Sequence, residues 1–493
     1  MSGPAGTELL LGIDAGTERL KAALYTREGR CLGAGEAPQG VVSPRPGWVE
    51  QDPVVWWRGL ARGVRAALAA AGVPGERVRA IGLSTQGGTL AVFDERGRPR
   101  GPALVWSDAR QQSGGDSEPR RLDQQFRLTG CYHLNMTPAG LGWLWEHRPE
   151  WFRGRWRVGF VPDYLSYRLT GWWVNDPTNL AISNLCQLAT LDIAEAVLAR
   201  LGVPRAAFGE TRRAGEAAGA LLPAAAETLG LPAGIPVAVA AHDQYAAALG
   251  AGCVQPGDLL LSAGTAWVAM LVTARPVLDR RSSFWPGPHV VEGRWGLLGA
   301  ISSGGSTLER VLALTRQRRE WPVVDEGAER VSPGSDGLLV IPHLVGRTLP
   351  TAARHARGAI LGLTLGHGRE HLWRAAMEGV AFEARVACEY LARRGADTRR
   401  LRMVGGGARS PLWPRIVASV LGVPVEACGG EDIAARGAAC LAARVAGLAD
   451  LPRAVAWQEH QPEPIWQVVY EEIYQGYRHA IRRLEGPGRR KAG

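Results

Sequence analysis

The sequence predicts an α/β fold, because short apolar segments typical of strands alternate with segments of helical pattern along the chain. A second observation indicates two related domains. The tripeptide Ala-Gly-Thr stands between two strand-like segments at residues 15–17 and again at 263–265, about half a chain apart. The length of 493 residues allows roughly two to four domains. We therefore expect two domains, over residues 1–250 and 251–493.

The N-terminal half begins with strand signals. Apolar segment 9–13 ends at a turn sequence, segment 21–25 follows, and a third strand begins near Cys31, which predicts a strand meander. Segment 54–71 has a helical pattern, and segment 141–201 looks mostly helical. Further strands are expected at 78–84, 90–93 and 103–106.

The same signals recur past the midpoint of the chain. Residues 236–241 read as a buried strand, and Asp243 opens an alanine-rich helix. Strands are then expected at 258–262, 267–272, 338–341 and 401–404. Helices are expected after Gly305, from Glu370, near 412–421 and at 434–446.

Composition disfavours several classes of protein. The net charge is +10, but 55 of the 57 basic residues are arginines dispersed along the chain, so we expect no nucleic-acid partner. The two lysines, Lys21 and Lys491, do not stand in the G-x-x-x-x-G-K-[ST] frame of a P-loop, so any nucleotide must be held in another way. The longest uncharged apolar segment, 259–274, is shorter than the ~20 residues of a membrane span, and we expect no membrane contact.

Targeting and metal signals are also weak. No basic region precedes the apolar segment at the N-terminus, which argues against a secretory signal. The seven cysteines have no C-x-x-C spacing, which favours reduced thiols in a cytoplasmic protein. Residues 367–371 match the H-x-x-E-H zinc pattern, but a helix starting at Glu370 would not bring both histidines to one face. We expect no zinc.

The two Gly-Thr turns have a chemical interpretation. Backbone N–H groups in such turns are fixed donors that suit phosphate, so Gly16 and Thr17, with Gly264 and Thr265, could hold a polyphosphate. Asp14 precedes the first turn and could hold Mg²⁺, directly or through water. The alternative is that each turn is only a hairpin.

Two helix openings are further candidates. Asp243 is either an N-cap or a carboxylate placed to accept a proton from a substrate hydroxyl. Gly405, Gly406 and Gly407, followed by Ser410, form either a shelf for a flat nucleotide or an ordinary loop.

Together these segments resemble the FGGY family of carbohydrate kinases, in its xylulokinase-like branch, over nearly the whole chain. Residues 12–17 and 261–267 resemble the two phosphate motifs of the family. Residues 47–53 are similar to its G-W-x-E-x-D-P segment, and residues 106–110 to its W-x-D-x-R segment. The most specific match is to its C-terminal signature, over residues 358–378.

The resemblance implies two actin-like ATPase (ribonuclease H-like) domains flanking a deep cleft, with sugar mainly on the first domain and ATP mainly on the second. It implies that Asp243 is the general base and that Asp14, with Asp243, helps to hold Mg²⁺, directly or through water. Thr17 and Thr265 would contact phosphates, and Gly305 and Gly406 would flank the nucleotide. Members of the family are often homodimers. Together with the shelf, the predicted ATP-binding residues are Gly16, Thr17, Gly264, Thr265, Gly305, Gly406, Gly407 and Ser410.

The sequence departs from the family at several positions. Glycerol kinases carry Arg-Glu after the glutamine that corresponds to Gln86, and many xylulokinases carry Met-His. Here Gly87 and Gly88 follow, which disfavours glycerol and would leave room for a larger substrate or make the loop more mobile. Gly140 replaces a usual lysine, and Glu18, close to the expected phosphates, is expected to face away from them.

The substrate candidates are therefore less specific than the kinase assignment. They are Gln86, Thr89, Trp106, Asp108, Asn135 and Gln244. Trp106 could stack on the apolar face of a sugar or simply pack in the core. The leading hypothesis is an ATP-dependent kinase of a ketose or polyol. A non-catalytic sugar sensor and an actin-type chaperone or scaffold ATPase are the alternatives.

Overall fold

The computed structural model describes residues 8–112, 118–133, 135–301, 303–449 and 455–485. These fall into two compact units. The first unit comprises Met1–Val254, Trp285–Gly296 and Asp432–Ala454, and the second comprises Gln255–Phe284, Leu297–Glu431 and Val455–Gly493. Segments Trp285–Gly296 and Asp432–Ala454 therefore belong to the same unit as the N-terminal residues. A single boundary after residue 250 does not separate the two units.

The first unit is built on a mixed sheet. Its strands lie in the order β14-β15-β6-β1-β2-β3, with β16 also paired to β6. The expected N-terminal meander is present, because β1, β2 and β3 pair antiparallel in sequence order. Strands β6, β15 and β16 run parallel to one another and to β1, so their carboxyl ends meet at one edge. The bounds are β1 Leu9–Ala15, β2 Arg19–Thr26, β3 Cys31–Pro38, β6 Val78–Thr85, β14 Ala217–Ala220, β15 Pro236–Ala238 and β16 Ala241–His242.

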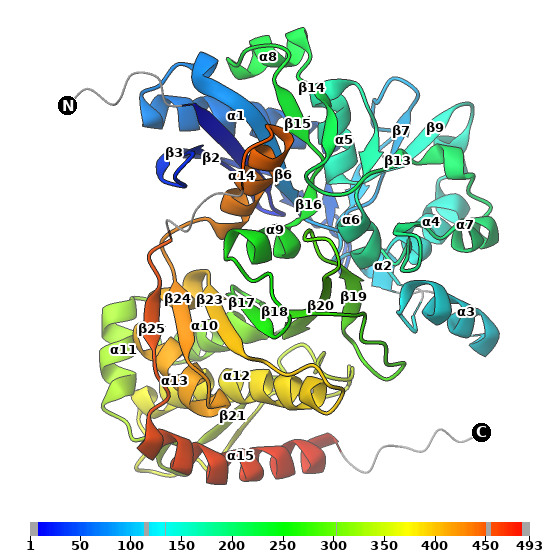
Figure 1. Ribbon diagram of the computed structural model, residues 1–493. Helices are drawn as coiled ribbons and strands as arrows, with labels where there is room; N and C mark the ends of the chain where they lie inside the picture. Colours follow the sequence, from blue (N-terminus) through cyan, green and yellow to red (C-terminus); the bar gives the residue numbers. More distant parts are fainter. Residues whose placement is uncertain (1–7, 113–117, 134, 302, 450–454, 486–493) are drawn as a thin grey trace. The chain divides into compact units, whose positions relative to one another are not determined.

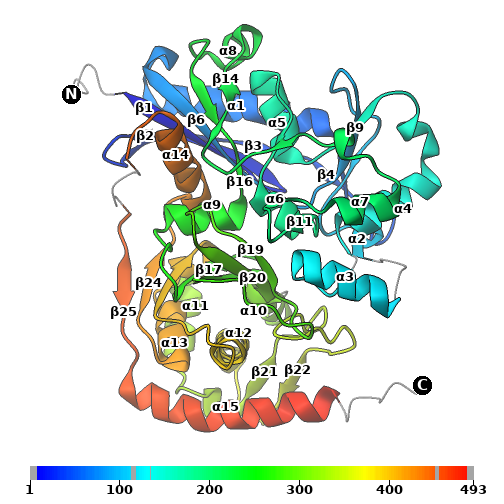
Figure 2. The same cartoon turned by 45° about the vertical axis from the view of Figure 1, so that its right-hand side comes forward.

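Helices cover both faces of this sheet. Leu11 and Ile13 of β1 join a cluster with α1 (Pro53–Ala71) and α5 (Val161–Thr170), whereas Leu10 joins a cluster with α9 (Asp243–Gly250) and α14 (Ile433–Val445). This division follows from the alternation of side chains along a strand. Figures 1 and 2 both show α14 against the strands near the N-terminus.

Glycines allow α14 to approach the sheet and α9 at backbone distance. A Cβ added at Gly12 would lie 2.0 Å from the carbonyl oxygen of Ala435, and one at Gly82 would lie 1.8 Å from that of Ala438. On the helix itself, a Cβ at Gly437 would lie 1.8 Å from the carbonyl oxygen of α9 Ala246. Helix α14 is distant from the N-terminus in the sequence, yet it packs within the first unit. This close packing is possible because these three positions carry no side chain.

The remainder of the first unit is only partly helical. Residues 141–201 contain helices, but also β9, which pairs with β7, and the paired β11 and β12. The expectation of a mostly helical segment was wrong at these places, because short apolar segments do not by themselves distinguish strand from helix. The helices are α2 Ala109–Gln112, α3 Pro119–Thr129, α4 Thr137–His147, α6 Pro177–Ile182, α7 Glu195–Leu201 and α8 Pro223–Leu229. The short strands are β4 Val41–Val42, β5 Glu50–Gln51, β7 Ala91–Asp94, β8 Ala103–Leu104, β9 Trp156–Gly159, β10 Val174–Asn175, β11 Cys186–Gln187, β12 Asp192–Ile193, β13 Glu210–Thr211 and β19 Trp285–Pro288.

The second unit has a sheet in the order β20-β18-β17-β23-β24-β25. As in the first unit, a hairpin (β17 and β18) continues into parallel strands (β17, β23 and β24). The strand bounds are β17 Asp258–Ala263, β18 Trp267–Thr273, β20 Trp295–Ile301, β21 Leu339–Ile341, β22 Ala359–Leu361, β23 Arg400–Val404, β24 Val425–Cys428 and β25 Gln458–His460. The helices are α10 Gly304–Leu314, α11 Trp321–Glu329, α12 Arg369–Ala392, α13 Leu412–Leu421 and α15 Pro464–Glu485.

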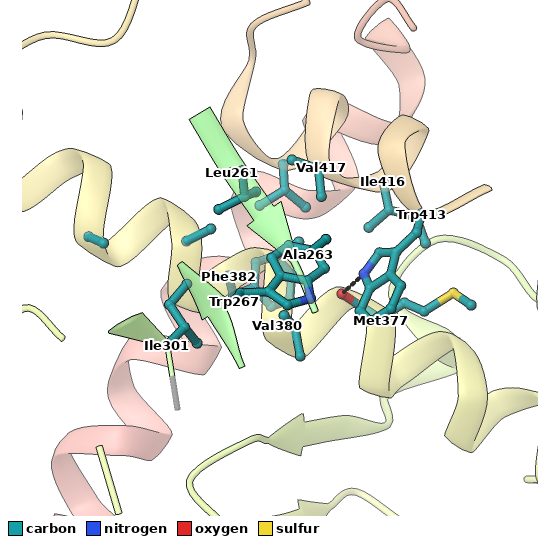
Figure 3. Packing of buried hydrophobic residues seen from close by; sticks show 14 of the residues in the cluster. Leu261, Ala263, Trp267, Ile301, Met377, Val380, Phe382, Trp413, Ile416 and Val417 are labelled. Carbon is teal, nitrogen blue, oxygen red and sulfur yellow. Dashed lines mark hydrogen bonds between the residues drawn. The ribbon is translucent and has the colours of Figure 1, made fainter. Parts of the chain in front are cut away.

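One large apolar core holds the second unit together. Trp267 and Trp413 lie side by side within it, with ring centroids 4.8 Å apart, and the indole N–H of Trp413 donates to the carbonyl oxygen of Met377 at 3.1 Å (Figure 3). Trp267 lies two residues after Thr265 of the second Gly-Thr turn, so the turn is anchored in the core.

The described residues include no helix that is long and apolar enough to cross a membrane. No disulfide joins any of the seven cysteines, all of which lie among the described residues.

Candidate active site

The carboxylates of the first unit meet because parallel strands end together. Asp14 on β1 is in register with Ser84 on β6, and Ala241 on β16 is in register with the same serine. Two residues further along, Asp243 begins α9. The carboxyl edge of a sheet that contains parallel strands is the usual place for a ligand site. The sheet therefore brings Asp14 and Asp243 to one edge.

The Asp14 carboxyl is held in an unusual environment. Burial raises its pKa well above the usual value, and the charges of Asp432 and Asp243 raise it further. The Ser84 hydroxyl donates to Asp14 Oδ1 at 2.7 Å, and this bond and Lys21 act in the opposite direction without overcoming the rise. A cation bound at this cluster would reverse the balance, because it favours the charged carboxylates.

Three members of this cluster were not predicted from sequence: Lys21, Ser84 and Asp432. Lys21 Nζ lies 2.7 Å from Asp432 Oδ2, and Asp432 also caps α14 by accepting from the backbone N–H of Ala435 at 2.9 Å. Burial lowers the pKa of Lys21, but Asp432 outweighs it and the net pKa is raised. One sequence signal was available, because Lys21 is one of only two lysines.

The donor set fits Mg²⁺ only with help from other ligands. Within the described ranges, no group of three or more His, Cys, Asp or Glu side chains is arranged to hold a metal. Asp14 and Asp243 could thus supply one or two carboxylate oxygens, directly or through water, and phosphate and water would complete the shell. That mixture is the coordination that Mg²⁺ commonly adopts in enzymes that bind nucleotides.

Asp243 is a helical residue and not the cap of its helix. The N-cap position of α9 is His242, and Asp243 is the first residue in the helix, so the N-cap interpretation of Asp243 was wrong. Its side chain is 27% exposed, and the His242 Nε2 atom lies 3.2 Å from its Oδ1. The carboxylate therefore combines access from outside with a fixed neighbour.

A polar network lies beside this edge. The Gln86 amide donates to Gln51 Oε1 at 3.0 Å, while the Thr17 and Thr89 hydroxyls donate to Gln86 Oε1 at 3.0 and 2.9 Å. The Trp106 indole N–H donates to the Thr17 hydroxyl at 3.0 Å. Three predicted substrate residues, Gln86, Thr89 and Trp106, are therefore brought together. Gln51 was missed, although it lies in the G-W-x-E-x-D-P segment.

The network changes the role expected of Thr17. Its hydroxyl donates to Gln86 and accepts from Trp106, so the hydroxyl is engaged within the first unit. A phosphate contact at this turn would then fall to the backbone N–H groups of Gly16 and Thr17, which suits a turn of this kind. The neighbouring Glu18 is exposed.

Asp108 is a structural residue in this fold, contrary to the expectation that it contacts substrate. It is fully buried, and its two oxygens accept from Arg110 and from the backbone N–H of Val49. Arg110 in turn reaches Glu50 at 2.7 Å and lies over the Trp48 ring at 3.8 Å. Glu50 of segment 47–53 and Asp108 of segment 106–110 are thus both bonded to Arg110, which fixes the two segments against each other.

The last two substrate candidates, Asn135 and Gln244, lie on other segments of the first unit. Asn135 Oδ1 accepts from the Asn184 side chain at 2.6 Å, and the Asn135 side chain is half-buried. Gln244 follows Asp243 in the first turn of α9 and is also half-buried.

The space beside Gly87 and Gly88 is already filled. A Cβ at Gly87 would lie 2.3 Å from His242 Cδ2, and a Cβ at Gly88 would lie 2.3 Å from Met136 Cε. The expectation that these glycines leave room for a larger substrate was wrong, because other side chains of this chain occupy the room. Gly140 is likewise enclosed, since its Cβ would lie 3.0 Å from Leu90 Cδ2.

In the second unit, the other Gly-Thr turn is bonded to a helix start. Gly264 and Thr265 are exposed at the end of β17. The backbone N–H of Gly305 donates to the Gly264 carbonyl at 3.1 Å, and that of Ser306 donates to the Thr265 carbonyl at 2.9 Å. A Cβ at Gly305 would lie 2.3 Å from the Gly264 oxygen, so only glycine permits this contact.

The glycine-rich segment of the second unit lies at the same strand end. Gly405 has φ of +88°, a conformation that favours glycine, and a Cβ there would lie 3.3 Å from the Ala263 carbonyl oxygen. Gly407 packs on the Ala263 side chain, and Gly406 lies between Gly405 and Gly407 in the sequence. The structure therefore gathers the predicted glycines around the carboxyl end of β17.

Ser410 does not share this accessibility. It is buried, its hydroxyl donates to Asp325 Oδ1 at 2.5 Å, and it accepts from the backbone N–H of Trp413 at 2.8 Å. The expectation that Ser410 binds the cofactor was therefore wrong for its side chain, which positions the start of α13.

The Asp325 carboxyl makes stability depend on pH. Burial raises its pKa to about 6, against the opposing bond from Ser410. Because the folded-state pKa lies above the unfolded value, the folded state binds the proton more tightly. The free energy of unfolding should therefore fall by roughly 2 kcal/mol as pH rises from about 4 to about 6. Urea unfolding of the wild type and Asp325→Asn across this range measures it, and the Asn variant should lack this component. Equal slopes for the two proteins would contradict it.

The H-x-x-E-H segment spans the start of a helix. α12 begins at Arg369, so His367 precedes the helix and accepts from the backbone N–H of Thr364. His371 Nε2 lies 3.2 Å from Asp336 Oδ2. Among the described residues around this segment, no group of three or more metal-ligating side chains is found.

Two family models match most of the chain. The model of the FGGY family of carbohydrate kinases, N-terminal domain, matches residues 9–250, and that of the C-terminal domain matches residues 259–446.

Known relatives match along the whole chain. The xylulose kinase of Escherichia coli is 28% identical over 97% of this chain and 99% of its own length. The glycerol kinase of Thermus brockianus is 34% identical over 97% of this chain and 98% of its own. The crystal structure of a xylulose kinase from Rhodospirillum rubrum superposes with a TM-score of 0.85, at 29% identity and coverage of 96% and 98%.

Proposed function

This chain belongs to the FGGY family of carbohydrate kinases, and we propose that it transfers the γ-phosphate of ATP to a hydroxyl of a ketose or polyol. The observation that carries the proposal is the meeting of Asp14 and Asp243 at one sheet edge, beside the Gln86 network. One carboxylate there is accessible and can accept a proton, and the other is poised to interact with a cation.

Asp243 acts as the general base in this proposal. Its carboxylate takes the proton of the acceptor hydroxyl as the hydroxyl oxygen attacks the γ-phosphorus and the bond to ADP breaks. Asp14, with Asp243, would hold Mg²⁺ through water or directly, and bound Mg²⁺ would neutralise charge on the phosphates. In phosphoryl transfer most catalysis comes from positioning and charge neutralisation, which suits residues fixed at strand ends.

The nucleotide is assigned to the second unit. The exposed Gly264–Thr265 turn offers backbone donors for phosphate, and the backbone of Gly406 offers a surface without side chains for the base or ribose. Gly305 and Gly407 are buried, so they support the backbone of these two segments and do not contact the nucleotide themselves.

The acceptor is assigned to the first unit, where Thr89, Gln86 and Trp106 provide polar groups and one aromatic face. A ketose of the xylulose type is the first candidate, in line with the xylulose kinase relative at 28% identity. Glycerol is the second, because the glycerol kinase relative is 34% identical. The absence of Arg-Glu after Gln86 counts against glycerol.

The direct test is ADP release by the purified protein with Mg·ATP, across a panel of ketoses, polyols including glycerol, and aldoses. We expect one ketose or polyol to stimulate ADP release and to gain phosphate, as mass spectrometry would show. Binding of sugar and nucleotide without any stimulated release would instead favour the non-catalytic sensor.

Trp106 should matter for the sugar and not for ATP. Its indole is 44% exposed beside Thr17, so it can pack against an acceptor. An aromatic contact contributes about 0.5–1.5 kcal/mol, so Trp106→Ala should raise KM for the sugar roughly 2- to 10-fold. KM for ATP should not change. Trp172→Ala, at a tryptophan that is 60% exposed, is the matched control. An unchanged sugar KM in Trp106→Ala would remove this residue from the sugar site.

A further inference from the structure

His242 directly precedes the proposed base and contacts it. Its side chain is only 7% exposed, and its Nε2 atom lies 3.2 Å from Asp243 Oδ1. At this distance a protonated Nε2 can donate to the carboxylate oxygen, whether the ring is neutral with its proton on Nε2 or charged. The contact therefore joins a buried donor to the accessible carboxylate.

The position of this ring is set by several neighbours. The backbone N–H of His242 donates to the Thr178 hydroxyl at 2.8 Å, and β16 places His242 in register with Thr85. The ring meets Tyr245 edge to face, with centroids 5.9 Å apart. The first two contacts fix the backbone of His242 against residues distant in the sequence, and the third packs its ring against α9, so the imidazole has a defined place.

Gly87 supplies the space for the ring. A Cβ at this position would lie 2.3 Å from His242 Cδ2 and 2.9 Å from Nε2, which is closer than real Cβ atoms approach other atoms. It would also lie 2.5 Å from Ile182 Cγ2. Any side chain at residue 87 would therefore displace the imidazole from the carboxylate.

We propose that His242 is a positioning residue for Asp243, and that Gly87 is required because it admits the imidazole. The proposal rests on the proposed kinase function. The imidazole N–H holds Oδ1, which fixes the carboxylate plane and leaves the other oxygen to take the proton of the acceptor hydroxyl. A base that is oriented by a third group is a recurrent arrangement in enzymes that activate a nucleophile.

Three substitutions at His242 separate positioning from packing. Gln carries an N–H near the position of Nε2, Phe keeps the ring shape without a donor, and Ala removes both. We expect His242→Gln to retain most of the turnover, and His242→Phe and His242→Ala to lose roughly 10- to 100-fold in kcat, because a misplaced reacting group costs about that much. Calorimetric dissociation constants for sugar and Mg·ADP should stay near those of the wild type.

Gly87→Ala tests the source of the space. It should lower kcat much as His242→Ala does, and it should do so also in an Ile182→Ala background, where the clash with Ile182 is removed. Combined with His242→Ala and Ile182→Ala, it should cause no further loss, since the imidazole is already absent. Such non-additivity is expected of residues that act through one contact.

The outcomes are distinguishable from failure of the kinase proposal. If the wild type phosphorylates no member of the panel, the kinase function is overturned, and the positioning role that rests on it is overturned with it. If Asp243→Asn abolishes turnover but His242→Phe keeps full kcat, the kinase stands and the positioning role is overturned. Loss in Phe, Gln and Ala alike, with lowered thermal unfolding temperatures, would also overturn it, because the role of His242 would then be structural.

Discussion

Asp243→Asn is expected to lower turnover by roughly 10²–10⁴ while sugar and nucleotide still bind. The amide has nearly the shape of the carboxylate, so the N-terminus of α9 should keep its structure, but it cannot accept the proton of the acceptor hydroxyl. Steady-state ADP release measures kcat, and calorimetry measures the two dissociation constants. An unchanged kcat would remove Asp243 from its role as base.

Asp52→Asn is the matched control for that substitution. Asp52 is an exposed aspartate that caps α1 by accepting from the backbone N–H of Val54 at 3.0 Å. Asparagine caps helices about as well as aspartate, so this variant should retain wild-type kcat. A similar loss in both variants would point to a general effect of removing a negative charge.

Gly82→Ala is expected to destabilise the first unit strongly. The new Cβ would lie 1.8 Å from the carbonyl oxygen of Ala438, and backbone atoms on both sides cannot move without separating α14 from β6. Overpacking commonly costs 1–3 kcal/mol and occasionally more, and a backbone clash belongs at about 3 kcal/mol or above. The free energy of unfolding in urea measures the loss.

Gly142→Ala is the control for Gly82→Ala. Gly142 lies within α4, and a Cβ there meets no atom within 4 Å. Alanine is favoured over glycine in a helix, so this variant should be as stable as the wild type or slightly more stable. Equal stability of the two variants would show that α14 does not pack on the sheet through Gly82.

The effect of Gly82→Ala should extend to the active site. α14 carries Asp432 at its N-cap, where the carboxylate meets Lys21 and raises the pKa of Asp14. Partial detachment of α14 would therefore change the charge around Asp14. A changed Mg²⁺ dependence of ATP binding by the folded fraction of Gly82→Ala is the expected consequence.

Local patterns were sufficient for much of this protein. Strands such as 9–13 and helices such as 54–71 follow from short-range hydrophobic periodicity and turn residues, which do not depend on distant parts of the chain. The recurrence of Ala-Gly-Thr predicted two related domains. In the structure, each unit contains a strand hairpin that continues into parallel strands. Asp14 and Asp243 were singled out because each follows or ends a strand, and in a sheet of this kind such positions meet.

The roles of single polar residues required the tertiary structure. Asp108 and Ser410 belong to motif-like segments, yet both are buried and bonded to Arg110 and Asp325. Whether a polar side chain faces a ligand or satisfies a buried partner depends on neighbours from distant parts of the sequence. No local pattern carries that information.

The sequence by itself determined the α/β class, the repeated turn and the two acidic residues, because these depend on order along one strand or helix. Only the tertiary structure decided that α14 completes the first unit and that His242 occupies the space beside Gly87. Both arrangements depend on glycines, because a position without a side chain allows another segment to pack closely against it. The local sequence does not indicate which segment that will be. That segment is selected by packing between segments far apart in the chain.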